Sequence, residues 1–282
     1  MAMLLEGLIV PLFAVGLGAP QFASGVDLVE VYATVTDARG EPVAGLTAAD
    51  FEVSEDGVAE RITVFAPGEF PLSVVVAIDR SFSMSGERLA LAKRAAVAFI
   101  QALRDEDEVT VVAIGSEIET VTPPTPARDA VRTPWEVIGP WGTTPLYDAT
   151  VKAIDLVHGR RGRRALLLLS DGDDRGSDTK AADLIDLARR SDVLVYPVAL
   201  AKHRPPIFAE LAGVTGGRSL FVTDPKRLDD ALVGLARELR VQYLIGYAPA
   251  ENAGRRPGWH AIDVRVHRPN LRVRARDGYV GR

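Results

Sequence analysis

The sequence contains no cysteine. This absence excludes disulfide bonds, thiolate metal sites, iron–sulfur clusters and cysteine nucleophiles. It does not choose a compartment, because a chain of 282 residues with 47% hydrophobic residues can build a large core without disulfides. The composition, with 25% charged residues, is that of an ordinary globular protein and excludes a wholly disordered or fibrous chain.

The sequence also lacks an excess of positive charge. It has 33 basic and 38 acidic residues and a formal net charge of −5. No overall positive field is present to attract nucleic acid, so we expect no nucleic-acid partner. The charge is unevenly placed, since residues 1–70 hold eleven acids against two arginines and residues 251–282 hold eight arginines against three acids. The two ends of the chain are complementary in charge, which favours their pairing.

The apolar run near the N-terminus is short. Residues 8–18, LIVPLFAVGLG, are too few to span a membrane, which takes about 20 residues. Their length fits the apolar segment of a secretory signal. Such a signal normally has a positive charge before this segment, whereas here no Lys or Arg precedes it and Glu6 is acidic. A buried strand or a misplaced start codon are the alternatives. We expect residues 1–20 to be a signal peptide, with an extracytoplasmic mature chain (periplasmic or secreted) that has no membrane span; otherwise the protein is cytoplasmic.

Strand-like and helix-like patterns alternate through the middle of the chain. Residues 73–79, SVVVAID, are typical of a parallel strand buried on both faces, and residues 86–103 carry apolar side chains at helical spacing. Further strands are expected at 109–114, 165–169, 193–200 and 219–222, and further helices at 145–157, 179–190, 207–212 and 225–239. This order predicts an α/β fold, a doubly wound and mostly parallel sheet, over residues 71–240.

Both flanking segments have the periodicity of β-strands. Residues 26–36 alternate apolar and polar side chains and, with the turn that follows, predict a hairpin. Other short strands are expected at 51–53, 62–65, 241–247, 260–267 and 271–275. The simplest assembly inserts the α/β domain into a small β-sandwich-like domain, of which residues 21–70 are the first half and residues 241–282 the second.

Three loops of the α/β segment carry hydroxyl and carboxylate groups. Residues 79–83 (DRSFS) and 170–174 (SDGDD) follow predicted strands, and residues 142–148 (GTTPLYD) lead into a predicted helix. Ligands of doubly wound sheets bind outside the carboxyl ends of the strands. Oxygen donors without nearby His or Cys suit a hard cation such as Mg²⁺, Mn²⁺ or Ca²⁺. The alternative to a cation site is that the serines and Asp79 only cap the helix that follows.

Together these loops resemble the metal-ion-dependent adhesion site of von Willebrand factor type A domains. The D-x-S-x-S motif is Asp79, Ser81 and Ser83, and the later loops align Thr144 and Asp171 with the remaining ligands, while Thr143 replaces a glycine of the family. The resemblance covers about residues 72–240 and implies a Rossmann-like fold. The flanking stretches VTDARGEPVAGLTAADFEVSEDG, RVQYLIGYAPA and VRARDGY resemble exported bacterial relatives of the acidobacterial type.

The resemblance implies a cation with one open position, which a carboxylate of a partner protein completes. The implied metal ligands are Asp79, Ser81, Ser83, Thr144 and Asp171. Mg²⁺ is the expected ion, with Mn²⁺ or Ca²⁺ as alternatives. The residues expected on the partner-binding rim are Arg80, Phe82, Thr143 and Asp173. The predicted function is a protein-binding module for adhesion or scaffolding, not an enzyme, whose partner presents an acidic side chain.

Other chemistries have less support in the sequence. No Walker loop, dinucleotide-binding fingerprint or G-x-S-x-G nucleophile elbow occurs. Serine hydrolysis needs a histidine base, and all four histidines lie outside the three loops. Mg²⁺-dependent phosphoryl transfer or hydrolysis at Asp79 stays an alternative, as does a purely structural envelope module. We expect Asp148 to accept hydrogen bonds at the start of its helix.

Overall fold

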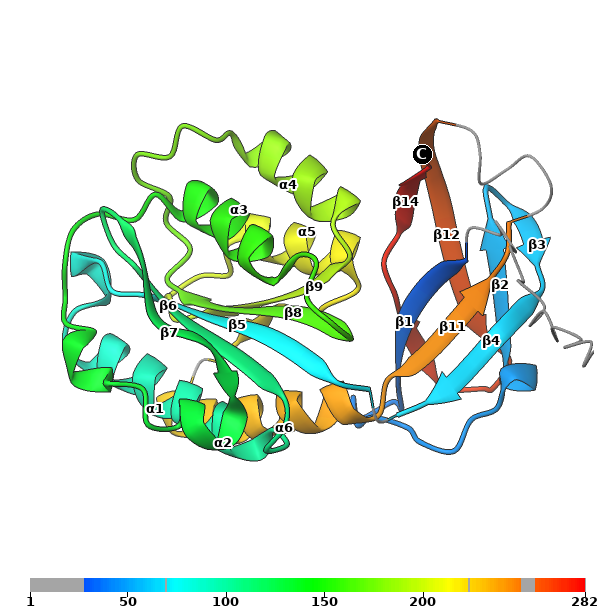
Figure 1. Ribbon diagram of the computed structural model, residues 1–282, viewed down its shortest axis with the longest axis horizontal. Coiled ribbons are helices and arrows are strands. Elements are labelled where there is room, and N and C mark those ends of the chain that lie inside the picture. Colours follow the sequence, from blue (N-terminus) through cyan, green and yellow to red (C-terminus); the bar gives the residue numbers. More distant parts are fainter. Residues whose placement is uncertain (1–27, 69, 223, 250–256, 282) are drawn as a thin grey trace, which may run out of the picture.

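The computed structural model describes residues 28–68, 70–222, 224–249 and 257–281, and these form an α/β domain beside a β domain (Figure 1). The predicted signal peptide, residues 1–20, lies outside the described residues. Within them, no helix combines the length and the apolar character that a membrane crossing requires.

The α/β domain is built on a sheet that, in the described part of the chain, has six strands in the order β10-β9-β8-β5-β6-β7. Its strands are β5 (Leu72–Asp79), β6 (Glu108–Ile114), β7 (Ile118–Pro126), β8 (Arg163–Ser170), β9 (Val193–Ala199) and β10 (Leu220–Phe221). All are parallel except β7, which pairs antiparallel with β6. The predicted α/β fold is confirmed. The periodicity missed β7, because its three prolines resemble a loop; an edge strand tolerates proline.

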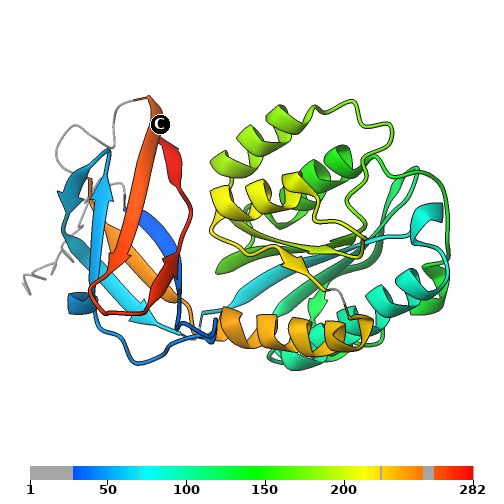
Figure 2. The ribbon, with the colours of Figure 1, turned by 180° about the vertical axis from the view of Figure 1, so that it is seen from behind.

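Helices cover both faces of this sheet (Figures 1 and 2). One face carries α1 (Glu87–Ala102), α2 (Ala127–Ala130) and α6 (Leu228–Arg240), and the other carries α3 (Leu146–Val157), α4 (Ala181–Arg190) and α5 (Pro206–Thr215). Short 3₁₀ turns lie at η1 (Ala48–Asp50), η2 (Phe82–Met84), η3 (Trp135–Val137) and η4 (Pro225–Arg227). Two cores result, one on each face, and all eight residues of β5 are buried between them. This double burial explains why the β5 sequence is continuously apolar.

The β domain consists of two four-stranded sheets in the described residues, ordered β13-β1-β11-β4 and β14-β12-β2-β3. Its strands are β1 (Val29–Thr36), β2 (Phe51–Glu55), β3 (Val58–Glu60), β4 (Ile62–Pro67), β11 (Tyr243–Tyr247), β12 (Gly258–Val266), β13 (Arg272–Arg274) and β14 (Gly278–Gly281). In each sheet a strand from before the α/β domain pairs antiparallel with one from after it, β1 with β11 and β2 with β12. The β domain therefore forms from both flanks of the chain.

The hairpin predicted after β1 is wrong. Both edges of β1 are occupied by strands from the far end of the chain, β11 and β13. The segment after β1 contributes a single bridge, between Thr36 and Pro42. A local alternation of side chains indicates a strand but not its partners, and here the partners lie about 200 residues away in the sequence.

Buried polar contacts join the two domains. Glu238 on α6 pairs with Arg274 of β13 at 2.6 Å and with Arg218 at 3.1 Å. Gln242, which follows α6, donates to Thr34 Oγ1 of β1 at 2.8 Å and accepts from Arg163 Nη1 at 3.2 Å. Buried charges and amides are stable only with such partners, so these contacts hold the domains in one arrangement.

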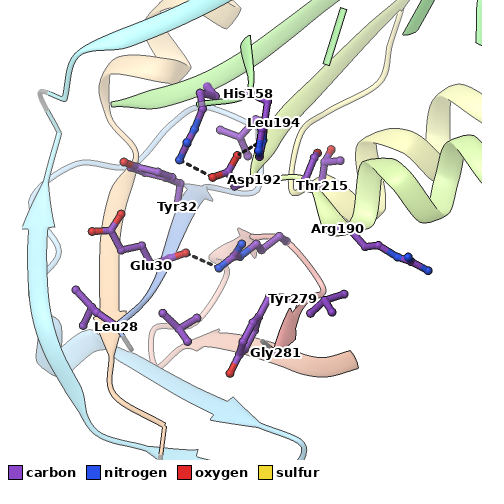
Figure 3. A pocket seen from close by; sticks show the side chains of 15 residues that line it. Leu28, Glu30, Tyr32, His158, Arg190, Asp192, Leu194, Thr215, Tyr279 and Gly281 are labelled. Carbon is purple, nitrogen blue, oxygen red and sulfur yellow. Dashed lines mark hydrogen bonds and ion pairs between the residues drawn. The ribbon is translucent and has the colours of Figure 1, made fainter. Parts of the chain in front are cut away.

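A cavity of about 380 Å³ lies at the same junction (Figure 3). On its α/β side Asp192 forms ion pairs with Arg164 at 2.6 Å and His158 at 3.7 Å. On its β side Arg276 donates to the carbonyl oxygen of Glu30 at 2.8 Å. These contacts each stay on one side of the cavity, and none of its charged residues belongs to the three predicted loops.

Candidate metal centre

The three loops meet at the carboxyl end of the parallel sheet. Asp79 ends β5, which pairs with β6 on one side and with β8 on the other. The chain continues from β5 to β6 and reaches β8 only later, so the boundary between β5 and β8 is the point where the strand order reverses. Ligands of doubly wound sheets bind at this point. The β domain lies beyond the opposite end of β5 (Figure 1).

Asp79 is fully buried, with 0% of its surface exposed. Its Oδ2 accepts a hydrogen bond from Ser170 Oγ at 2.7 Å, and its Oδ1 accepts from the Ser81 amide at 2.9 Å and from Thr144 Oγ1 at 3.3 Å. Burial raises the pKa of the Asp79 carboxyl and the charge of Asp171 adds to this, while the hydrogen bonds from Ser170 and Ser81 oppose it. A bound cation would relieve this penalty, because an opposite charge favours the ionised carboxylate.

The two serines of the D-x-S-x-S motif lie side by side. Ser81 Oγ and Ser83 Oγ are 3.1 Å apart, on the short turn η2 that Met84 anchors in the core. Neither serine caps the next helix, since α1 begins after Gly86 and its N-cap has no side-chain hydrogen bond. The helix-capping alternative for these serines therefore does not hold.

Gly142 sets the position of Thr144. Its φ is +77°, and a Cβ added there would clash with the side chain and backbone nitrogen of Ser116. Only glycine fits such a backbone position without strain. The carbonyl oxygen of Gly142 accepts from the Phe82 amide at 3.2 Å, and the Thr143 amide donates to Ser116 Oγ at 3.2 Å. The first bond holds the Thr144 loop against the loop of residues 79–83, and the second holds it against the turn between β6 and β7.

Asp171 completes the predicted group. It is 7% exposed, and its Oδ1 accepts from the amide of Asp173 at 3.2 Å. Its Oδ2 lies 4.0 Å from Arg88 Nη1, and the same guanidinium donates to the Ser83 carbonyl oxygen at 3.1 Å. The sequence interpretation did not name Arg88, and it included Ser170 in the third loop without giving it a role. Ser170 directly precedes Asp171 at the strand end, but its bond to Asp79 joins residues 91 positions apart, which no local pattern reveals.

Three of the four residues predicted for the partner-binding rim are exposed, and Arg80 is not. Phe82 is 66% exposed, and Thr143 and Asp173 are exposed as well. Arg80, expected to point outward, is only 9% exposed. Its amide donates to the Ile114 carbonyl oxygen, so Arg80 continues the β5 pairing with β6. Its guanidinium forms an ion pair with Glu119 of β7 at 2.8 Å.

Two residues beside the site, Asp148 and Trp141, have structural roles. Asp148 accepts from the amides of Thr179 at 2.9 Å and Asp178 at 3.0 Å, which ties the start of α3 to the segment before α4. A hydrogen bond from the Thr179 side chain, together with these two weaker amide bonds, lowers the pKa of Asp148. The Trp141 ring stacks under the Arg80 guanidinium, 5.1 Å from the ring centroid. Both residues support the loops.

A depression of about 660 Å³ adjoins Asp171. Basic side chains contribute to its lining, namely Arg88, Lys202, His203 and Arg204. The last three belong to the segment between β9 and α5, which the neighbouring β8–β9 pairing brings beside the Asp171 loop. His203 thus borders the site although it lies outside the three loops in the sequence.

The donor set fits a hard divalent cation. It offers two carboxylates and three hydroxyls, and two pairs of these oxygen atoms already contact each other: Thr144 Oγ1 with Asp79 Oδ1, and Ser81 Oγ with Ser83 Oγ. Mg²⁺ and Mn²⁺ prefer such oxygen ligands. The chain can therefore present one buried carboxylate, one nearly buried carboxylate and neutral hydroxyls to a single ion.

Comparisons with known proteins bear on the family and the fold of this chain. Residues 74–173 match the von Willebrand factor type A domain family. A von Willebrand factor type A structure from Catenulispora acidiphila is 15% identical with a TM-score of 0.53, and the match covers 93% of this chain and 65% of that one. The PilB minor pilin from Streptococcus sanguinis is 12% identical with a TM-score of 0.51, covering 61% of this chain and 62% of that one.

A third similar structure is the vWF domain of the type V pili tip protein Mfa5 from Porphyromonas gingivalis, which is 12% identical with a TM-score of 0.50. The match covers 61% of this chain and 95% of that one. This chain spans less than two thirds of the Catenulispora and PilB structures. No protein of curated function matches the sequence. At these identities the similar structures share the fold. The family match and the fold together confirm the family that the sequence resembles: this chain contains a von Willebrand factor type A domain, matched over residues 74–173.

Proposed function

We propose that this protein is a metal-ion-dependent protein-binding module for adhesion or scaffolding. The cation ligands are Asp79, Ser81, Ser83, Thr144 and Asp171. The ion is Mg²⁺, with Mn²⁺ or Ca²⁺ as alternatives, and it supplies an electrophilic position that a carboxylate of a partner protein completes. The observation that carries the proposal is the buried Asp79 carboxylate in contact with Ser81 and Thr144 at the strand-order reversal.

The surroundings favour an acidic partner. Three of the five ligands are neutral hydroxyls, so the ion keeps much of its positive charge for an incoming carboxylate. The basic side chains of the adjoining depression, Arg88 and Lys202 among them, add to the attraction. The exposed Phe82 ring supplies apolar contact area next to the ion. Nothing in this arrangement requires turnover, and we therefore propose binding without catalysis.

An extracytoplasmic location is part of the proposal. Similar structures include a protein described as a minor pilin and another described as a pili tip protein. Together with the apolar segment at residues 8–18, these names favour a chain that acts at a bacterial surface.

The test is capture of partners from an envelope fraction by the immobilised full chain. We expect capture with Mg²⁺, loss with chelator, recovery on adding Mg²⁺ back, and no capture by Asp79→Ala. Amidation of carboxyl groups in the fraction should also abolish it. Capture that survives chelator contradicts the proposal and favours the structural module. Hydrolysis of a generic phosphomonoester above a metal-only control favours the enzymatic alternative.

Phe82→Ala should weaken partner binding by about tenfold or more, because an aromatic contact at the centre of an interface typically contributes 1 to 2 kcal/mol or more. The melting temperature should stay nearly unchanged, since the ring is 66% exposed. Val58→Ala, which truncates another exposed apolar side chain in the β domain, is the matched control. Equal affinities of the two variants would show that the rim does not contact the partner.

A further inference from the structure

A second cluster of metal-ligating side chains lies in the β domain, far along the chain from the first site. Glu55, Asp56 and His260 each offer one ligand atom, and these three atoms lie within 4.8 Å of one another. Glu55 and Asp56 stand at the turn between β2 and β3, and His260 stands on β12. The cluster therefore joins the two halves of the split β domain.

Backbone contacts hold Asp56 in place. Its φ is +50°, and its amide donates to the Ala261 carbonyl oxygen at 2.9 Å while its Oδ1 accepts from the Ala261 amide at 2.9 Å. Its other oxygen, Oδ2, lies 2.9 Å from His260 Nδ1. The imidazole itself stacks on the ring of Tyr279, with 5.2 Å between the centroids. Both side chains are thus positioned before any ligand arrives.

Glu55 presents a buried oxygen to this group. Its side chain is 1% exposed, and its Oε2 accepts hydrogen bonds from Tyr247 Oη at 2.8 Å and Tyr279 Oη at 3.0 Å. Burial raises the pKa of both phenols, so they remain donors. Its Oε1 is buried and accepts no hydrogen bond from the described residues, although it lies 3.5 Å from His260 Nδ1.

A single hydrogen on His260 Nδ1 cannot satisfy both carboxylate oxygens that face it. Nδ1 of a histidine carries at most one hydrogen, and Asp56 Oδ2 is the closer acceptor, at 2.9 Å against 3.5 Å for Glu55 Oε1. A buried carboxylate oxygen without a partner is unfavourable. One cation bound between the three atoms would satisfy all of them at once.

We infer that Glu55, Asp56 and His260 form a second divalent-metal site, of the zinc type. An imidazole nitrogen with two carboxylate oxygens suits Zn²⁺ better than Mg²⁺, which favours oxygen ligands alone. Three protein ligands leave a position for water, and the half-exposed Asp56 side chain provides access for the ion. Tyr247 and Tyr279 orient the Glu55 carboxylate, as outer hydrogen bonds do at metal sites.

This site would act as a clamp. Its ligands come from segments about 200 residues apart, on either side of the α/β domain. Metal binding that requires both segments in place stabilises the folded β domain, because the unfolded chain lacks the assembled site. This stabilisation does not need the cation site proposed at Asp79 in the α/β domain.

The test uses the full chain carrying Asp79→Ala, so that the first site does not contribute. We expect calorimetry to show one equivalent of Zn²⁺ bound and a higher melting temperature, with no such response to Mg²⁺. His260→Gln and Asp56→Asn should each weaken zinc binding by about tenfold or more, since even loss of an outer partner of a ligand has that effect. Asn tolerates a positive φ and keeps an oxygen for the Ala261 amide, so Asp56→Asn preserves the turn.

His267→Gln is the matched control, because His267 also faces a carboxylate, Glu52 at 3.3 Å, but lies outside the cluster. It should bind zinc as the parent does. Failure of the parent to bind zinc would overturn the inference, as would equal binding by Asp56→Asn; the cluster would then be an imidazole held between carboxylates. If His260→Gln does not fold, the comparison of Asp56→Asn with His267→Gln still decides. Because the first site is removed throughout, these outcomes are independent of the proposed function.

Discussion

Asp79→Ala should abolish the rise in melting temperature that Mg²⁺ or Mn²⁺ gives the unaltered protein. A ligand at a hundredfold excess over its dissociation constant stabilises the folded state by about 2.7 kcal/mol, which for a domain of this size corresponds to roughly 5 to 10 °C. Asp79 is expected to carry most of this effect, because it is the fully buried carboxylate of the group and contacts Ser170, Ser81 and Thr144.

The measurement is thermal unfolding of each variant with chelator and with added ion. The quantity compared is the shift within each variant, because removal of a buried carboxylate also changes stability without metal. Asp178→Ala is the control, since Asp178 is an exposed acid in the segment before α4 and is not one of the predicted ligands. Its shift should match that of the unaltered protein. Equal shifts for Asp79→Ala and the unaltered protein would show that the metal site is assigned to the wrong residues.

Glu238→Ala should destabilise the folded protein by about 3 kcal/mol. Glu238 is 2% exposed in its side chain and forms ion pairs with Arg274 at 2.6 Å and Arg218 at 3.1 Å. Breaking a buried ion pair from one side typically costs about 3 to 5 kcal/mol, because the remaining charge is left without its partner. We take the lower figure, since both arginines are partly exposed and water can solvate them.

Urea unfolding at equilibrium measures this effect. Glu238→Gln should lie between the unaltered protein and Glu238→Ala, because the amide keeps the shape and one acceptor but not the charge. Asp230→Ala removes an exposed acid from the same helix, α6, and should change stability by less than about 1 kcal/mol. A Glu238→Ala variant as stable as the Asp230→Ala control would mean that this ion-pair group does not hold the domains together.

The α/β domain was predictable because its signals are local. The apolar run of β5 and the helical spacing of α1 reflect burial on both faces of a sheet, and every residue of such a strand carries that signal. The pairing of strands is not a local signal, and the hairpin predicted after β1 was therefore wrong. Both neighbours of β1 come from the other end of the chain, and the side-chain pattern around β1 does not identify them.

The candidate site likewise has features that the local sequence predicts and features that depend on the folded chain. The D-x-S-x-S spacing is contained within five residues, and a strand end before it already indicates where Asp79, Ser81 and Ser83 lie. The inward turn of Arg80 depends on its continued pairing with Ile114 and on Glu119 in the next strand. The bond from Ser170 to Asp79 and the basic side chains beside Asp171 likewise depend on strands that meet only in the folded chain.

By itself, the sequence determined the absence of thiol chemistry, the α/β class of the central segment and the residues of the three oxygen-bearing loops. Composition and short-range periodicity suffice for these, because each is a property of neighbouring residues. Only the tertiary structure decided how the flanks pair into two sheets, which side chains support Asp79, and that Glu55 and Asp56 meet His260 across about 200 residues. These contacts form when the core closes and brings distant segments together, so their energies belong to pairs that the linear order does not show.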